Sequence, residues 1–187
     1  KVPFRAKNLG ADLISVSGHK IHAPKGIGAL YIRSGVKLKP FLVGGSQEAG
    51  RRAGTEPLPQ IAAFAAACAQ DPRTDQIRAM KALAREQLSA AVPEIRMLDT
   101  DAPHLLSVSL PGWRSEVLMN FLEARGIYVS KSSACKQGKR SHVLEAIGLP
   151  ADVIDGSLRL GFSRYTTAED IAALVQGLKD ARKLAHR

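Results

Sequence analysis

Apolar residues near the start of the chain follow the pattern of strands. Residues 12–16 and 27–33 are rich in β-branched and aromatic side chains over strand-like lengths. The glycines and prolines between these runs predict a connecting loop. The first run has the apolar character typical of a buried central strand. We therefore expect two strands joined by a loop, with the first strand buried.

The pattern then changes to helical spacing. Glycine and proline recur too often over residues 43–59 for any regular element. Pro59 suits the first turn of a helix, which the alanine-rich residues 60–70 continue. Residues 74–91 place apolar side chains at intervals of three and four, as in an amphipathic helix. A long loop followed by two helices is therefore expected.

After Pro93 short strand patterns alternate with helical patterns, which is typical of an α/β or α+β layer domain. A helix is expected over residues 115–125, closed by Gly126. The last helix is expected to open with Thr166 and Glu169 at capping-box spacing and to bury one apolar face. The expected strands cover residues 95–98, 104–110, 127–130 and 157–162.

These patterns divide the chain into parts. We expect residues 1–72 to form one domain, residues 73–92 a connecting helix, and residues 93–187 a second, smaller domain. A length of 187 residues agrees with this division, because domains usually hold ~150 residues.

Composition narrows the class of protein. Hydrophobic residues make up 45% and charged residues 24%, close to the average for globular proteins and far from fibrous or disordered chains. The longest apolar run, residues 61–69, is too short to span a membrane. Cys68 and Cys135 lie far apart, and the N-terminus has no apolar stretch of the signal-peptide type, which favours a reducing cytoplasm.

The net charge of +10 raises the question of a nucleic-acid or acidic partner. The basic residues are scattered, however, and they lack both aromatic interleaving and zinc-finger spacing. Direct binding of nucleic acid is therefore not expected.

The segment Ser17-Gly18-His19-Lys20 directly follows the first predicted strand. A lysine that is desolvated beside other cations favours the neutral amine, which attacks a carbonyl to form a Schiff base. Ser17 and His19 supply donors for a phosphate beside it. A lysine that merely extends over the loop surface is the alternative. His19 and His22 have no third ligand nearby, so no metal site is expected.

Cys135 lies in a small, polar stretch with cationic neighbours. Such neighbours favour the thiolate, which is the reactive form of cysteine, although a chance surface cysteine is the alternative. Cys68 lies in the alanine-rich helix and is expected to be a small core residue. His142 begins a helix near Cys135 and is a candidate for proton transfer.

Arginines supply candidate anion sites. Arg159 alternates with two leucines in a strand pattern, so its side chain points to the face opposite theirs. Its planar fork would bind a carboxylate at two points, and a structural ion pair is the alternative. Arg51, Arg52 and Thr55, in a loop bounded by glycines, would surround an anion.

Together these segments resemble the cysteine desulfurases of the class V aminotransferase group, which depend on pyridoxal 5'-phosphate and move sulfur from L-cysteine to a protein thiol. The resemblance extends over nearly the whole chain. It rests on four blocks in order: Ser-Val-Ser-Gly-His-Lys-Ile-His-Ala-Pro-Lys-Gly-Ile-Gly-Ala-Leu-Tyr (15–31), Gly-Gly-Ser-Gln-Glu-Ala-Gly-Arg-Arg-Ala-Gly-Thr-Glu (44–56), Ser-Ser-Ala-Cys (132–135) and Gly-Ser-Leu-Arg-Leu (156–160).

The resemblance implies a fold class of α/β type: residues 1–72 form the second part of a fold type I, cofactor-binding large domain, and residues 93–187 form most of a small α+β C-terminal domain. It implies a homodimer, and a sulfur-acceptor protein or scaffold in iron–sulfur cluster or thio-cofactor assembly. The cofactor ring acts as the electron sink, while the protein supplies position and charge.

The resemblance also assigns roles to residues. Lys20 would be the Schiff-base lysine and the general base and acid, and Ser17 and His19 would hold the cofactor phosphate. Thr55 would reach the phosphate of the partner subunit. Arg159 would bind the substrate carboxylate. Cys135 would be the nucleophile that takes the sulfur as a persulfide.

Two departures from the family pattern affect these expectations. Only Lys139 and Arg140 separate Gly138 from Ser141, so the cysteine loop is shorter than usual. The aspartate and the stacking aromatic residue that the family places before the lysine do not precede Lys1, so the isolated chain is expected to bind the cofactor poorly and to show little activity. A selenocysteine or cysteine lyase, and a non-catalytic truncated binding module, are the alternatives.

Overall fold

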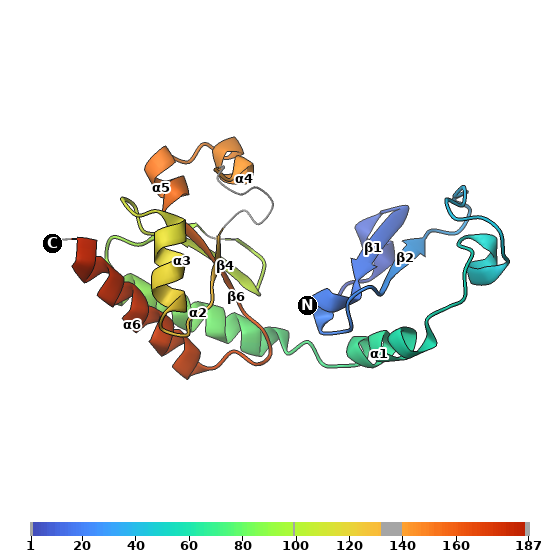
Figure 1. Ribbon diagram of the computed structural model, residues 1–187, viewed down its shortest axis with the longest axis horizontal. Helices are drawn as coiled ribbons and strands as arrows, with labels where there is room; N and C mark the ends of the chain where they lie inside the picture. The colour runs from blue at the N-terminus through green and yellow to red at the C-terminus, as the bar shows by residue number, and fades with distance from the viewer. Residues whose placement is uncertain (1, 99, 132–139, 186–187) are drawn as a thin grey trace. The chain divides into compact units, whose positions relative to one another are not determined.

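The computed structural model describes residues 2–98, 100–131 and 140–185. Its contacts divide the chain into two compact units, Lys1–Pro72 and Arg73–Arg187, which are described separately below (Figure 1).

The first unit is built on a two-stranded antiparallel sheet. Strand β1 (Leu13–Ser17) pairs with β2 (Gly28–Ile32), with Ser17 opposite Gly28. Both predicted strands are thus confirmed, with each of their four ends displaced by one residue. The first unit's helical elements are the 3-10 helices η1 (Ala6–Leu9), η2 (Gly18–Ile21) and η3 (Gln47–Gly50) and the helix α1 (Leu58–Cys68), which has Pro59 in its first turn.

Two burial predictions for this unit are wrong. Leu13 and Val16 of β1 are 43% and 36% exposed, because a sheet of two strands has no further layer to cover them. Cys68 is exposed and is not a core residue. The alanine-rich sequence of this helix predicts that it is helical, but it gives little information about which face is buried.

The second unit is a four-stranded antiparallel sheet in the order β3-β4-β6-β5. The strands are β3 (Arg96–Leu98), β4 (Leu105–Ser109), β5 (Ser130–Lys131) and β6 (Ser157–Gly161). The helices are α2 (Thr74–Ala91), α3 (Ser115–Glu123), α4 (His142–Ala146), α5 (Ala151–Asp155) and α6 (Ala168–Ala185).

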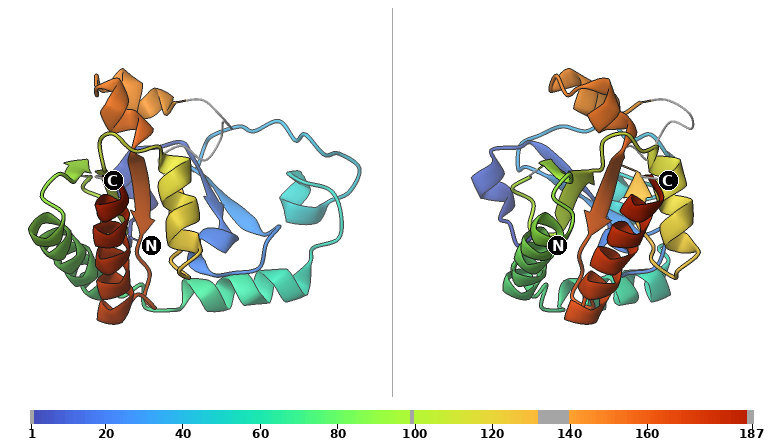
Figure 2. Two further views of the ribbon diagram at one scale, coloured as in Figure 1. Left: turned by 60° about the vertical axis from the view of Figure 1, so that its left-hand side comes forward. Right: turned by 90° about the vertical axis from the view of Figure 1, so that its left-hand side faces the viewer.

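Helices α2, α3 and α6 cover one face of this sheet. Figure 2 shows α2 and α6 side by side, and α3 packs against α6, β5 and β6. The alternation along the two central strands explains this layer: every second residue of β4 and β6 is apolar and faces the helices. The buried core includes Leu88, Leu106, Val108, Leu118, Leu158, Leu160, Ile171 and Leu178. Among the described residues, no helix has the length and apolar character needed to cross a membrane.

Several element ends in the second unit lie one or two residues from prediction, and β5 and the cap of α6 differ as well. The strand expected at residues 127–130 is confined to Ser130–Lys131. The capping box of α6 lies one residue later than predicted: the N–H of Thr167 donates to Asp170 Oδ2 at 2.9 Å, and the N–H of Asp170 donates to Thr167 Oγ1 at 3.2 Å. Thr166 Oγ1 instead accepts from the N–H of Ser163 at 3.0 Å.

Candidate functional site

The turn after β1 passes so close to Ile27 that it leaves no room for a side chain at position 18. The N–H of Gly18 donates to Ile27 O at 2.9 Å, and the N–H of Ala23 donates to Gly18 O at 3.1 Å. A Cβ atom on Gly18 would lie 2.9 Å from the oxygen and 3.0 Å from Cγ2 of Ile27, closer than side-chain atoms pack. Gly18 is therefore required for β1 and the start of β2 to approach each other, and η2 follows directly.

This turn brings three predicted site residues together. Ser17 ends β1, and His19 and Lys20 lie in η2. All three are exposed within their unit, so the unit itself does not supply the desolvation of Lys20 expected from the sequence. A hydroxyl, an imidazole and a primary amine suit a ligand that combines a phosphate with an aldehyde.

The loop that carries Thr55 is held mainly through backbone atoms. The N–H of Ala53 donates to Leu42 O at 3.1 Å, and the N–H of Gly54 donates to the side-chain oxygen of Gln47 at 3.2 Å. Thr55 follows these contacts directly and is exposed. Its hydroxyl is thus presented from an ordered loop and is accessible to a ligand.

Arg159 lies in the middle of the second unit's sheet. It is the register partner of Ser107 on β4 and of Ser130 on β5. Its neighbours Leu158 and Leu160 are buried on the helix-covered face, so Arg159 points to the other face, as the sequence predicts. Directly opposite residues share a face, which places Arg159 between two hydroxyl side chains. In this row, a guanidinium flanked by two hydroxyl groups is available to bind a carboxylate.

Helix α5 covers that face beside Arg159. Ser109 Oγ donates to Val153 O at 2.6 Å, and Ser157 Oγ donates to Ile154 O at 2.7 Å. Both serines are buried, so these hydrogen bonds are sheltered from water and fix α5 to the ends of β4 and β6. Strand β6, which carries Arg159, therefore follows directly after a helix, α5, that is held firmly against the sheet.

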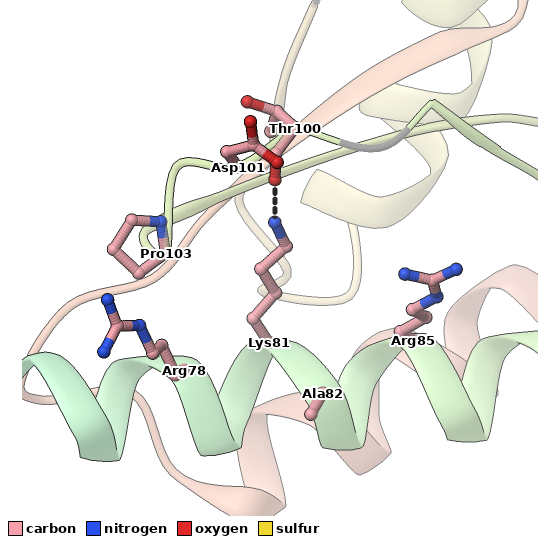
Figure 3. A pocket seen from close by; sticks show the side chains of 7 residues that line it. All are labelled: Arg78, Lys81, Ala82, Arg85, Thr100, Asp101 and Pro103. Atoms are coloured by element: carbon pink, nitrogen blue, oxygen red, sulfur yellow. Dashed lines mark hydrogen bonds between the residues drawn. The ribbon is translucent and has the colours of Figure 1, made fainter.

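A separate cleft of about 640 Å³ lies between α2 and the β3–β4 connection (Figure 3). Its basic side chains already interact within the chain: Arg78 pairs with Asp75 at 3.2 Å, and Lys81 Nζ donates to Thr100 O and to Ala102 O. Arg85 is not free either. We therefore assign Lys81 the role of holding the β3–β4 connection on α2.

The structure distributes the predicted site residues over both units. Ser17, His19, Lys20 and Thr55 belong to the first unit and Arg159 to the second, whereas Cys135 lies outside the described residues. Ser107 and Ser130 were missed from the sequence, because strand register gives no local signal. Across the described part of the chain, no three His, Cys, Asp or Glu side chains gather as a metal site would require.

Comparisons with known proteins agree on one family. The family model described as aminotransferase class-V matches residues 1–174. Cysteine desulfurase 2 of Trichormus variabilis is 42% identical over 185 residues, which cover 94% of this chain and 46% of that protein. Cysteine desulfurase IscS of Methanosarcina thermophila is 40% identical, with the same shares covered. The chain thus spans about half the length of the curated relatives it matches.

A solved structure described as a NifS-like protein has a similar fold. It matches with a TM-score of 0.84 and 32% identity, over 98% of this chain and 50% of that one.

Proposed function

The chain belongs to the aminotransferase class-V family, and we propose that the whole protein is a pyridoxal-phosphate-dependent cysteine desulfurase. It converts L-cysteine to L-alanine and transfers the sulfur to Cys135 as a persulfide. The observation that carries this proposal is the glycine-constrained turn that presents Ser17, His19 and Lys20 together, in a chain 42% identical to a protein named cysteine desulfurase.

The side chains of this turn fit the cofactor's functional groups. Ser17 and His19 would hold the phosphate, and the amine of Lys20 would hold the aldehyde group. When bound, the cofactor ring supplies an electron sink for the substrate's α-carbon. Lys20 removes the proton from that carbon and later returns one, as a positioned general base and acid.

Arg159 orients the substrate. Its guanidinium binds the cysteine carboxylate through two parallel hydrogen bonds, and its register partners Ser107 and Ser130 lie on the same face of the sheet. Arginine suits this task better than lysine because its planar fork matches a carboxylate and fixes its direction.

Cys135 takes the sulfur atom. Its thiolate attacks the substrate sulfur, a sulfur–sulfur bond forms, and the bond between that sulfur and the substrate's β-carbon breaks. The electron pair and a proton remain with the three-carbon product, which leaves as alanine. One thiol and one cysteine thus give one persulfide and one alanine, and no external oxidant is needed.

The whole protein acts as a cytoplasmic homodimer, in which Thr55 reaches the phosphate bound by the partner subunit. Cys135 passes its sulfur to an acceptor protein in iron–sulfur cluster or thio-cofactor assembly. The isolated 187-residue chain binds the cofactor poorly, because Lys20 and its neighbours are exposed within their unit.

The test compares two preparations. Full-length protein should show the absorbance band of lysine-bound cofactor and should release alanine from L-cysteine, and both signals should be weak for the isolated chain. Full-length protein that binds the cofactor but forms no alanine from L-cysteine would contradict the proposed activity.

A further inference from the structure

The side chain of Arg159 is half-buried, and no acidic side chain among the described residues pairs with it. Elsewhere in the same unit arginines do find such partners: Arg140 Nε and Nη2 donate to the two oxygens of Asp155, both at 2.7 Å. A partly desolvated guanidinium without an anion is unfavourable, because its charge and its N–H donors lose water without a replacement. The described part of the chain thus supplies no structural ion pair for Arg159, and its guanidinium is available for an external anion.

The serines on either side of Arg159 are likewise available. Ser107 on β4 and Ser130 on β5 are its register partners and share its face of the sheet. Both are half-buried, and neither hydroxyl forms a hydrogen bond with another described residue. The neighbouring pair on this face, Ser109 and Ser157, differs, because both of its hydroxyls donate to backbone oxygens of α5. One serine pair therefore holds the fold together, and the other is free to bind a ligand.

The row formed by Ser107, Arg159 and Ser130, here called the serine–arginine row, is covered on one side and open on the other. Helix α5 covers the face on the side of β6 that begins at Ser157. On the other side Gly161 follows on the same face of β6 and is exposed. A Cβ atom at Gly161 would meet no described atom within 4 Å. The missing side chain leaves space beside the guanidinium for a small anion.

We propose that Ser107 and Ser130 bind the substrate carboxylate together with Arg159, and so determine the affinity of this site for an α-amino acid. The guanidinium fork binds one edge of a carboxylate through two parallel hydrogen bonds. The remaining lone pairs of the carboxylate accept from a hydroxyl on either side. Contacts from three neighbouring strands fix the orientation of the carboxylate as well as its charge. This inference rests on the proposed function, because it takes L-cysteine as the substrate.

The test measures binding and turnover in full-length protein with Ser107→Ala or Ser130→Ala. Calorimetric titration with L-alanine, which has the carboxylate but no sulfur, gives a dissociation constant that does not depend on activity. Each variant should raise this constant and the KM for L-cysteine about fivefold, the effect of losing one hydrogen bond. The kcat should stay unchanged, because the carboxylate is bound equally in the ground state and the transition state. Ser107→Thr and Ser130→Thr keep the hydroxyl and should restore most of the affinity.

Ser109→Ala is the matched control. It removes a hydroxyl from the same face of the same strand as Ser107, but one that donates to Val153 O. It should lower the free energy of unfolding and leave the dissociation constant for L-alanine unchanged. Unchanged affinity for L-alanine in both Ser107→Ala and Ser130→Ala, or an equal loss in Ser109→Ala, would overturn the role of the two serines. If the unmodified protein binds L-alanine but forms no alanine from L-cysteine, the proposed activity is refuted instead, and the titrations still test the serine–arginine row.

Discussion

Ser130 and Arg159 lie directly opposite each other on β5 and β6. Ser130 is thus bound into the sheet beside the proposed substrate site. The neighbours of Arg159 on β6 are buried in the core, so the packing of the second unit determines the face of the sheet to which Arg159 points.

Replacing Arg159 with lysine tests the carboxylate site. Arg159→Lys keeps the charge but loses the planar fork, so the KM for L-cysteine should rise about tenfold, the effect of losing one good charged hydrogen bond. Steady-state kinetics of the full-length protein measure this. Arg96→Lys, at an exposed position on β3, is the matched control, and an equal KM in the two variants would argue against the assignment.

Removal of the Lys20 amine tests the cofactor attachment. Lys20→Ala should abolish trapping of the cofactor by borohydride and lower alanine formation by at least about 100-fold. Lys25→Ala removes a nearby exposed lysine and should leave both signals close to those of the unmodified protein. Mass spectrometry of the trapped peptide identifies the attachment site, and attachment at any other lysine would disprove the role given to Lys20.

Gly156 tests the fit of α5 on the sheet. A Cβ atom in Gly156→Ala would overlap the backbone oxygen of Leu110, so the free energy of unfolding should fall by about 1–3 kcal/mol. Gly161→Ala is the control, because a Cβ atom at Gly161 meets nothing within 4 Å. Urea denaturation measures both variants, and equal stabilities would show that α5 does not pack as described.

Asp155 makes stability depend on pH. The hydrogen bond from Arg140 lowers the pKa of Asp155, and the charges of Arg140 and Arg114 lower it further, while partial burial opposes them. A folded-state pKa below the unfolded value, about 3.9, means that the pair stabilises the fold above that pH. This stabilisation is lost as the pH falls through the folded pKa.

The measurement compares the free energies of unfolding of the unmodified chain and of Asp155→Asn. Their difference should be constant from about pH 7 to about pH 5 and should shrink below about pH 4. Asp152→Asn, on the same helix, preserves the Arg140–Asp155 pair and is the matched control. A difference that grows on acidification would contradict the described pair.

Much of the fold follows from local patterns, and the exceptions have physical causes. The apolar stripe of α2 predicted its bounds, Thr74 and Ala91, because an amphipathic face has a strong period. The local pattern of β1 indicates a buried strand and gives no sign of its exposure, because burial depends on how many strands adjoin it. The shift of the α6 cap could not be predicted, because Thr166 and Thr167 each have an acidic residue three positions later. In the structure Thr166 Oγ1 accepts from the N–H of Ser163, and Thr167 forms the cap with Asp170.

The candidate site was only partly predictable. The Ser17–Lys20 segment is a candidate from its place after a strand, and its role is assigned only by the family resemblance. The ion pairs at Lys131 and Arg140 were not predictable, because their partners Glu116 and Asp155 are set by tertiary packing. Long-range pairs of this kind leave no periodic signal in the chain.

The central claim is that Cys135 receives sulfur from L-cysteine. The most direct measurement reacts full-length protein carrying Cys68→Ser, which removes the other, exposed thiol, with one equivalent of L-cysteine. Alanine and persulfide are then quantified, and the persulfide is located by mass spectrometry. We expect equal amounts of alanine and persulfide, with the persulfide on Cys135. After Cys135→Ala we expect neither product. Undiminished turnover of L-cysteine in Cys135→Ala would contradict it.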